Sequence, residues 1–295
     1  PAFAHVTWTE ATSAYGPLFT LVTYPLAWLP VGAAVAVLKG VAALSVLGIA
    51  LLVSRIAAWR GVDSLRAAAF VALNPLVLVH VVGDAHNDAL TMLLAMLAVA
   101  SILSARELSG GAALVAAIAT KLSAAFLAPF ALLGTIASPP TGRKGAYIDR
   151  NRPVGRLFVG ALAAAAVIGA AAWFAFGWDW LHGFGLAGEN QSRTSHMSIP
   201  ITVARLTGLD PDAVRLAAAI LFAALVAYLL TWTLRGGDWI RAAAWTAFAL
   251  LIATSWLLPW YLIWPLPLVA ISRDRPLQLL TLALTAYQLG ARIPL

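Results

Sequence analysis

Two carboxylates and an imidazole lie within five positions of each other in a chain that is otherwise largely apolar. They belong to the hexapeptide Gly83-Asp84-Ala85-His86-Asn87-Asp88, which has long apolar runs on both sides. Ionisable groups at a bilayer edge are costly unless solvated or paired, so they usually serve a function. On a helix Asp84 and Asp88 would share one face, where their repulsion raises one pKa and suits acid–base chemistry or cation binding. The alternative is a solvated turn with Asp88 capping the next helix. A metal site has only a thin ligand set here.

Two lysines lie inside apolar runs. Lys121 follows Thr120 near the middle of residues 110–137, where it either extends toward the membrane surface or holds an anion. The Thr120 hydroxyl could help to bind a phosphate. Lys39 lies in the first third of another apolar run, as an anchor or as a second phosphate contact.

Polar and aromatic side chains occur in two further segments. Residues 189–196 carry amides and hydroxyls suited to sugar hydroxyls, with His196 at the end and Arg193 able to clamp a phosphate. A plain solvated loop is the alternative. Trp260 and Tyr261 follow a helix-breaking proline, and they are either interface anchors or a surface for sugar stacking.

Composition narrows the class of protein. The 295 residues are 62% hydrophobic and 11% charged, and they include no cysteine. Long apolar runs with few charges predict an all-α, polytopic transmembrane bundle, because open strands cannot satisfy their backbone in lipid. The net charge of +7 comes from short clusters between these runs, a pattern of membrane topology rather than of nucleic-acid binding. Without cysteine, disulfides and thiol chemistry are excluded.

The basic clusters predict the topology. If all of them are cytoplasmic, about ten membrane segments result, and the chain turns outside at residues 83–88, near Lys121, and through a long outer loop at 177–212. We expect two short or tilted helices around Lys121 and a kink at Pro75. Residues 1–32 would end an outer loop with an interfacial helix at Tyr15–Trp28, and residues 33–295 would form the transmembrane domain. Two crossings between residues 16 and 53 are the alternative, which would put Arg55, Arg60 and Arg66 outside.

Several segments resemble one family, the actinobacterial polyprenol-phosphomannose-dependent α-1,6-mannosyltransferases, which are GT-C-type membrane enzymes that build lipomannan. The resemblance covers essentially the whole chain in order. The segments that carry it are Asn74-Pro75-Leu76 with Gly83 to Leu90, Tyr15-Gly16-Pro17-Leu18, Ala119-Thr120-Lys121, and Pro259-Trp260-Tyr261-Leu262-Ile263-Trp264.

The resemblance implies a site and a mechanism. A polyprenyl-phosphate sugar would enter from the outer leaflet, an acid would deprotonate the acceptor hydroxyl, and the anomeric carbon would invert. Basic residues would hold the leaving phosphate. In the family the base lies in the first outer loop, just after the first transmembrane helix. We therefore expect the chain to be N-terminally truncated, with the base upstream of Pro1 or replaced by Glu10, Asp84 or Asp88.

The resemblance thus implies a plasma-membrane glycosyltransferase that acts on the outer, periplasmic side, with mannose as the expected sugar and arabinose or another pentose as the alternative. Its partners would be a polyprenyl-phosphate sugar, a glycan or glycolipid acceptor and membrane lipid, with no metal or other cofactor. The expected substrate-binding residues are Tyr15, Lys39, His86, Asn87, Lys121, Arg193, His196, Trp260 and Tyr261. A transporter or flippase of a lipid-linked sugar and an assembly subunit are the alternatives. The transporter is disfavoured because the polar residues gather at one end and no internal repeat is evident.

Overall fold

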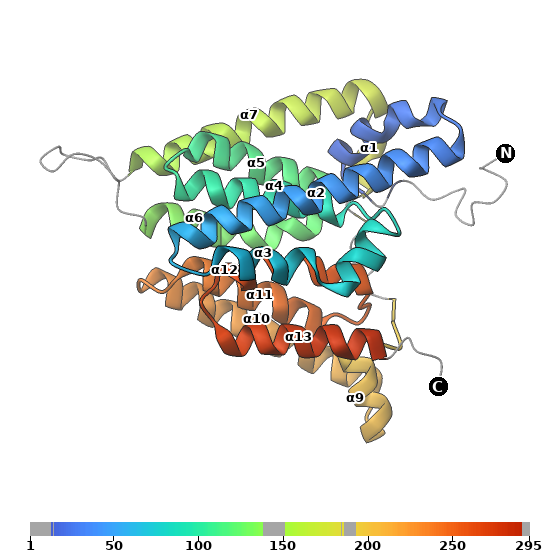
Figure 1. The fold of residues 1–295 in the computed structure, drawn as a ribbon, viewed down its shortest axis with the longest axis vertical. Coiled ribbons are helices and arrows are strands. Elements are labelled where there is room, and N and C mark those ends of the chain that lie inside the picture. The colour runs from blue at the N-terminus through green and yellow to red at the C-terminus, as the bar shows by residue number, and fades with distance from the viewer. Residues whose placement is uncertain (1–12, 14, 138–150, 184, 186–192, 291–295) are drawn as a thin grey trace, which may run out of the picture.

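Helices make up all the regular structure of the part of the chain described by the computed structural model, namely residues 13, 15–137, 151–183, 185 and 193–290 (Figure 1). The first half contains α1 (Pro17–Thr23), η2 (Tyr24–Trp28), α2 (Val31–Trp59), α3 (Ser64–Ala72), η3 (Val77–Val82), α4 (Asp88–Leu103), α5 (Glu107–Thr120), η4 (Leu122–Leu127) and α6 (Ala128–Ala137). The second half contains α7 (Asn151–Phe176), η5 (Asp179–Leu181), α9 (Ile199–Thr207), α10 (Pro211–Leu234), α11 (Trp239–Ala253), η6 (Pro259–Ile263), α12 (Leu266–Ile271) and α13 (Arg275–Gly290).

The all-helical class is confirmed, whereas the ten or so membrane segments are not. Three helices of the described part are long and apolar enough to cross a membrane: Val31–Trp59, Pro153–Phe176 and Pro211–Leu234. Other apolar helices are shorter; α5, for example, has 14 residues. Such a helix is about 21 Å long, against a hydrocarbon core of about 30 Å.

Several helix breaks occur where the sequence predicts them. α3 ends before Pro75, whose ring removes a backbone donor, and the Asn74 side chain accepts a hydrogen bond from the Leu76 amide at 3.0 Å. The second break separates α5 from η4 and α6 at Lys121, which has an extended backbone. The predicted interfacial stretch forms α1 and η2, and Tyr24 and Trp28 are exposed there. The predicted outer loop is less loop-like than expected, since η5 and α9 lie within it.

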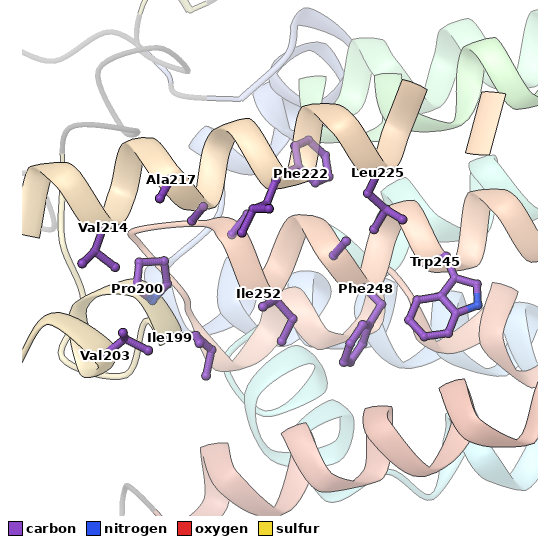
Figure 2. A pocket seen from close by; sticks show the side chains of 14 residues that line it. Ile199, Pro200, Val203, Val214, Ala217, Phe222, Leu225, Trp245, Phe248 and Ile252 are labelled. Carbon is purple, nitrogen blue, oxygen red and sulfur yellow. The ribbon is translucent and has the colours of Figure 1, made fainter. Parts of the chain in front are cut away.

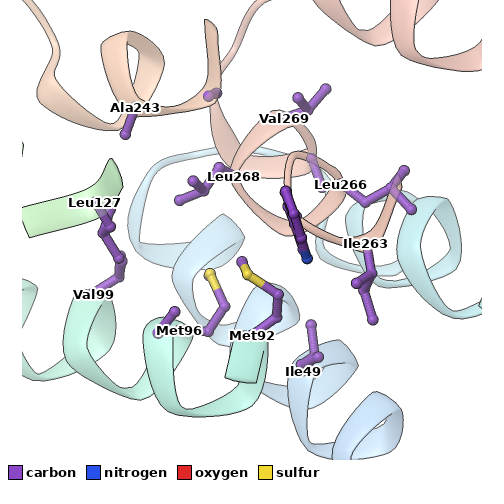
Figure 3. Close-up of a cluster of buried hydrophobic side chains, with 14 of the residues drawn as sticks. Ile49, Met92, Met96, Val99, Leu127, Ala243, Ile263, Leu266, Leu268 and Val269 are labelled. Atoms are coloured by element: carbon purple, nitrogen blue, oxygen red, sulfur yellow. The ribbon is translucent and has the colours of Figure 1, made fainter. Parts of the chain in front are cut away.

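The core forms around α4, which is apolar on all sides and packs against α2 and α5. Met92 and Met96 of this helix are fully buried and face Leu268 of α12 (Figure 3). Ile49 of α2 lies at the same cluster. α4 is thus held between the two halves of the chain, and its first residue is Asp88.

One end of the bundle is joined by arginines, and we call it the arginine end. Arg60, after α2, pairs with Asp238 before α11 and donates to the Ile271 carbonyl at 2.8 Å. Arg241 pairs with the buried Asp274 at 2.7 Å. Although burial alone would raise the pKa of Asp274, hydrogen bonds from Leu277, Trp245 and Arg241 lower it. These contacts join the α2–α3, α10–α11 and α12–α13 turns. Hexapeptide 83–88 lies at the opposite end of the hairpin that begins at Arg60.

Two glycines bring α5 and α7 into close contact. A Cβ at Gly111 would lie 2.0 Å from the Leu157 carbonyl oxygen, and one at Gly160 would lie 1.9 Å from that of Leu108. Each glycine therefore faces the backbone of the other helix, and no side-chain movement could relieve a clash. The crossing depends on glycine at both positions.

We expect Gly160→Ala to destabilise the protein by about 1–3 kcal/mol, because the two helix backbones must separate. Gly169→Ala in the same helix is the matched control, since a Cβ there meets nothing within 4 Å. Alanine favours helix over glycine, so the control should be neutral or slightly stabilising. The free energy of unfolding in mixed micelles measures both, and equal effects would contradict the close crossing.

Candidate functional site

Hexapeptide 83–88 forms a tight turn between two helices. The six residues before it, Val77–Val82, form a π-helix, a rare geometry that is often found at functional sites. Ala85 has a left-handed backbone with φ of 59°, which is unfavourable for a residue with a Cβ. A Cβ at Gly83 would lie 2.1 Å from the Val79 carbonyl oxygen, so glycine is needed there. The surrounding packing holds this strained turn in place.

The two acids of the turn do not form a pair. Asp84 lies in the turn itself rather than on a helix, and its carboxylate lies 3.0 Å from Nδ1 of His80. Half of the Asp84 side chain is exposed, whereas Asp88 is fully buried as the first residue of α4. The expected face shared by Asp84 and Asp88 is therefore absent, because the turn separates them from a common helix. Each acid has its own partner instead.

Asp88 is bound on both oxygens. Nζ of Lys121 lies 2.8 Å from Oδ1 and 2.8 Å from Oδ2, and the Trp264 indole donates to Oδ1 at 2.6 Å. Residues from α4, the α5–η4 break and the segment after η6 thus meet at one buried carboxylate. A buried charge needs such pairing, because its desolvation is otherwise too costly. We call Asp88, Lys121 and Trp264 the charged triad.

The position of Lys121 depends on the N-terminal part of the chain. The Gly16 amide donates to the Thr120 carbonyl at 3.1 Å, next to the lysine. A Cβ at Gly16 would lie 2.1 Å from the Ala119 carbonyl oxygen, so only glycine permits this approach. Two segments with a family resemblance, Tyr15–Leu18 and Ala119–Lys121, are therefore in direct contact.

Aromatic rings surround the ammonium group of Lys121. Its Nζ lies 5.1 Å from the ring centroid of Tyr261 and 5.6 Å from that of Trp264, and these two rings stack at 4.3 Å. Both distances fit cation–π attraction. Burial and the Asp88 carboxylate raise the pKa of Tyr15, so its phenol remains a hydrogen-bond donor at neutral pH. The ammonium is thus held by a carboxylate and two rings, with a phenol close by.

His86 and Asn87 directly precede Asp88 of the charged triad in the sequence. The His86 ring stacks on Trp260 with centroids 3.7 Å apart. Burial lowers the pKa of His86, so the imidazole is neutral at pH 7. The Asn87 side chain is buried, and neither its oxygen nor its nitrogen has a hydrogen-bond partner. The turn thus supplies a flat surface and an amide that could both contact a sugar.

We expect acid to destabilise the protein at His86, because burial disfavours the protonated imidazole. Because the folded-state pKa of His86 is below its usual 6.5, the unfolded chain binds the proton more tightly, and stability is lost as pH falls through 6.5. His86→Phe keeps the stacking and removes the proton, so it should lose less stability between pH 7.5 and pH 5.5. Thermal unfolding at both pH values tests this. His196→Phe, at an exposed histidine, should behave like the wild type.

Residues 193–195 are hydrogen-bonded to residues 255–257, just before the aromatic segment 259–264. Ser195 donates two hydrogen bonds to this part of the chain: its amide donates to the Ser255 carbonyl at 2.9 Å, and its hydroxyl donates to the Leu257 carbonyl at 2.9 Å. The Ser255 hydroxyl donates to the Arg193 carbonyl at 3.0 Å. The stretch after α7 is therefore docked just before Pro259. It positions Trp260, Tyr261 and Trp264 indirectly.

The structure gathers most of the predicted site residues but not all. Asp88, Lys121 and Tyr261 meet directly, and Tyr15 and the stacked His86 and Trp260 flank them. Lys39 is exposed on α2 and His196 is exposed, while the Arg193 guanidinium lies 4.8 Å from the Trp256 ring. None of these three has a contact with the charged triad among the described interactions. Glu10 lies outside the described residues.

Two site residues were missing from the sequence-based prediction. Trp264 belongs to a segment that shows the family resemblance, yet only its neighbours Trp260 and Tyr261 were selected. His80 lies four positions before Asp84, a spacing that brings side chains together on a helix and could have indicated the pair. Within the described ranges, no group of three or more potential ligands is placed to hold a metal.

An apolar groove lies between α9, α10 and α11 (Figure 2). Its volume is about 380 Å³, and every lining residue is apolar. Val203 and Pro200 of α9 close one end, and Trp245 and Phe248 of α11 lie toward the other. α10, which also lines the groove, is one of the three helices of the described part that are long and apolar enough to cross a membrane.

Comparison with known proteins supports the resemblance. Residues 3–137 match the family model "Alpha-(1->6)-mannopyranosyltransferase, N-terminal domain". The chain is also 29% identical over 298 residues to alpha-(1->6)-mannopyranosyltransferase A of Mycobacterium tuberculosis. These matches show a similarity to the α-(1→6)-mannopyranosyltransferases over residues 3–137 and, more weakly, over most of the chain. The match covers 89% of the chain and 53% of that curated relative, so the chain spans about half of its length. No solved structure shows a significant match.

The similarity to the mannopyranosyltransferases agrees with the geometry of the charged triad. The segment matched by the family model holds Tyr15, hexapeptide 83–88 and Lys121. These parts are far apart in sequence, yet they converge on Asp88. Trp264 lies beyond the family match, so the charged triad is completed by the second half of the chain.

Proposed function

We propose that the protein is a membrane mannosyltransferase of the inverting, GT-C type, which takes its sugar from a polyprenyl phosphate at the outer face of the plasma membrane. The observation that carries this proposal is the lysine–carboxylate–indole cluster, wrapped in aromatic rings, at the end of the bundle opposite the arginines. A cation is needed where a phosphate leaves, and aromatic rings suit a sugar.

In the proposed reaction the acceptor hydroxyl oxygen attacks the anomeric carbon. The bond from that carbon to the phosphate oxygen breaks, and polyprenyl phosphate leaves with the electron pair. Lys121 would stabilise the charge that develops on this phosphate. The stacked His86 and Trp260 would support the sugar, and the Asn87 amide would bind its hydroxyls.

The hydroxyl proton needs a base other than Asp88, whose oxygens are both engaged. Asp84 is the acid of the turn that is open to solvent. Glu10, outside the described residues, and an acid upstream of Pro1 are the other candidates.

The groove between α9, α10 and α11 supports a lipid donor. Its apolar lining suits an isoprenoid chain, which could enter the groove from the membrane without meeting polar groups. α9 directly follows the stretch that Ser195 docks before the aromatic segment, so the groove begins near the site.

Membrane vesicles that contain the protein provide the test. With polyprenyl phosphate bearing labelled mannose and a mannosyl acceptor, label should pass to the glycan and free polyprenyl phosphate should accumulate. A nucleotide-linked mannose should not support transfer. Label that crosses the membrane without any new glycan would instead favour the transporter.

A further inference from the structure

The two charges of the Lys121–Asp88 pair differ in their access to solvent. The Asp88 side chain is fully buried, whereas that of Lys121 is 16% exposed. Asp88 therefore lies on the inner side of the ammonium group, and an incoming ligand would meet Lys121. Both Asp88 oxygens are used, and the Trp264 indole holds one of them at 2.6 Å.

We propose that Asp88 is a positioning residue that sets how strongly Lys121 binds the phosphate of the lipid. It orients the ammonium group and offsets its charge, so that the polyprenyl phosphate product is released after each turnover. This inference rests on the proposed function, in which Lys121 meets that phosphate.

The physical reason is the charge of the site. A bare, part-buried ammonium flanked by two rings attracts a phosphate strongly, because the surroundings screen little. With Asp88 in place, the phosphate meets a pair whose net charge is zero. The electrostatic attraction between Lys121 and the phosphate is then weaker, while Asp88 still orients the N–H groups of Lys121. Tight binding of the leaving group would slow turnover, since product release would limit the rate.

Asp88→Asn tests the role of the charge directly. The variant keeps the shape of the side chain and an oxygen that can accept from Trp264. Because Lys121 is partly exposed and held by the rings, this variant should fold. We expect it to bind farnesyl phosphate in detergent micelles about tenfold to hundredfold more tightly than the wild type. Farnesol, which has no phosphate, should bind equally to both.

One further variant is a control, and another is a second test. Asp212→Asn removes the same charge from an exposed site, where the carboxylate pairs with Arg215, and should leave farnesyl phosphate affinity unchanged. Trp264→Phe keeps the ring and deprives Asp88 of a donor, so Asp88 should neutralise Lys121 more fully. Farnesyl phosphate should then bind more weakly than to the wild type. This opposite shift also tests the inference should Asp88→Asn fail to fold.

The outcomes separate the two proposals. Farnesyl phosphate that binds the wild type, but binds Asp88→Asn equally or more weakly, overturns the role of Asp88 and leaves the glycosyltransferase standing. An equal gain for farnesol would also overturn it, because the effect would then not involve the phosphate. If the wild type shows no phosphate-dependent binding at all, both proposals fail. If Asp88 had only a structural role, Asp88→Asn would not tighten the binding of farnesyl phosphate.

Discussion

Lys121→Met should destabilise the protein by about 3–5 kcal/mol, because the fully buried Asp88 carboxyl would lose its counter-ion. The Trp264 indole would remain as a single donor for this carboxylate. We expect a lower free energy of unfolding in mixed micelles and a lower yield of folded protein. Few single substitutions cost this much.

Lys39→Met is the matched control for this loss. It removes a lysine from an apolar helix in the same way, but Lys39 is exposed. We expect its effect to remain within about 0.5 kcal/mol. Equal losses in the two variants would show that Asp88 does not depend on Lys121. A small loss at Lys121 would show that water reaches the carboxylate.

The double substitution Asp88→Asn with Lys121→Met should recover most of the stability and yet lose transfer activity. Replacing both partners of a buried ion pair by neutral groups of similar size is often neutral, so the fold should return. The cation at the leaving phosphate would still be missing. We expect kcat for mannose transfer to fall by about 100-fold to 1000-fold, the range typical for loss of one stabilising group at a developing charge.

The double variant separates the role of the Lys121–Asp88 pair in stability from the role of Lys121 in sugar transfer. A rescued fold with rescued transfer would show that the pair is only structural, and Lys121 would lose its role at the phosphate. A rescued fold without transfer would support it. Initial rates at several concentrations of lipid donor separate kcat from KM, and the Lys39→Met protein serves as the active reference in the same membranes.

Much of the local structure follows from the sequence. The apolar runs determine an all-helical chain, and the break before Pro75 follows from the missing backbone donor. The break at Lys121 was also predicted from the sequence, because residues 110–137 are long for one membrane helix and short for two. Hexapeptide 83–88 is an unusual polar segment in an apolar chain, which is enough to predict a site there.

The predicted number of membrane segments is not confirmed by the structure. Counting arginine clusters gave about ten, whereas three helices of the described part are long enough to cross. Hydropathy shows that a run of residues is apolar, but it does not show where breaks in the backbone divide that run into shorter helices. α4 has 16 residues and α5 has 14, and each packs against a longer neighbour, α2 or α7.

Sequence alone was enough to predict the candidate residues: Asp84, Asp88, His86 and Lys121 all lie at the end of the bundle away from the arginines. Only the tertiary structure decided their partners. Lys121 is 33 positions from Asp88 and Trp264 is 176 positions away, and no local pattern relates them. Helix packing brings them together, and the cost of a buried carboxylate keeps them there. The two acids that look like a pair in the sequence are thus separated in space, one solvated beside His80 and the other enclosed by Lys121 and Trp264.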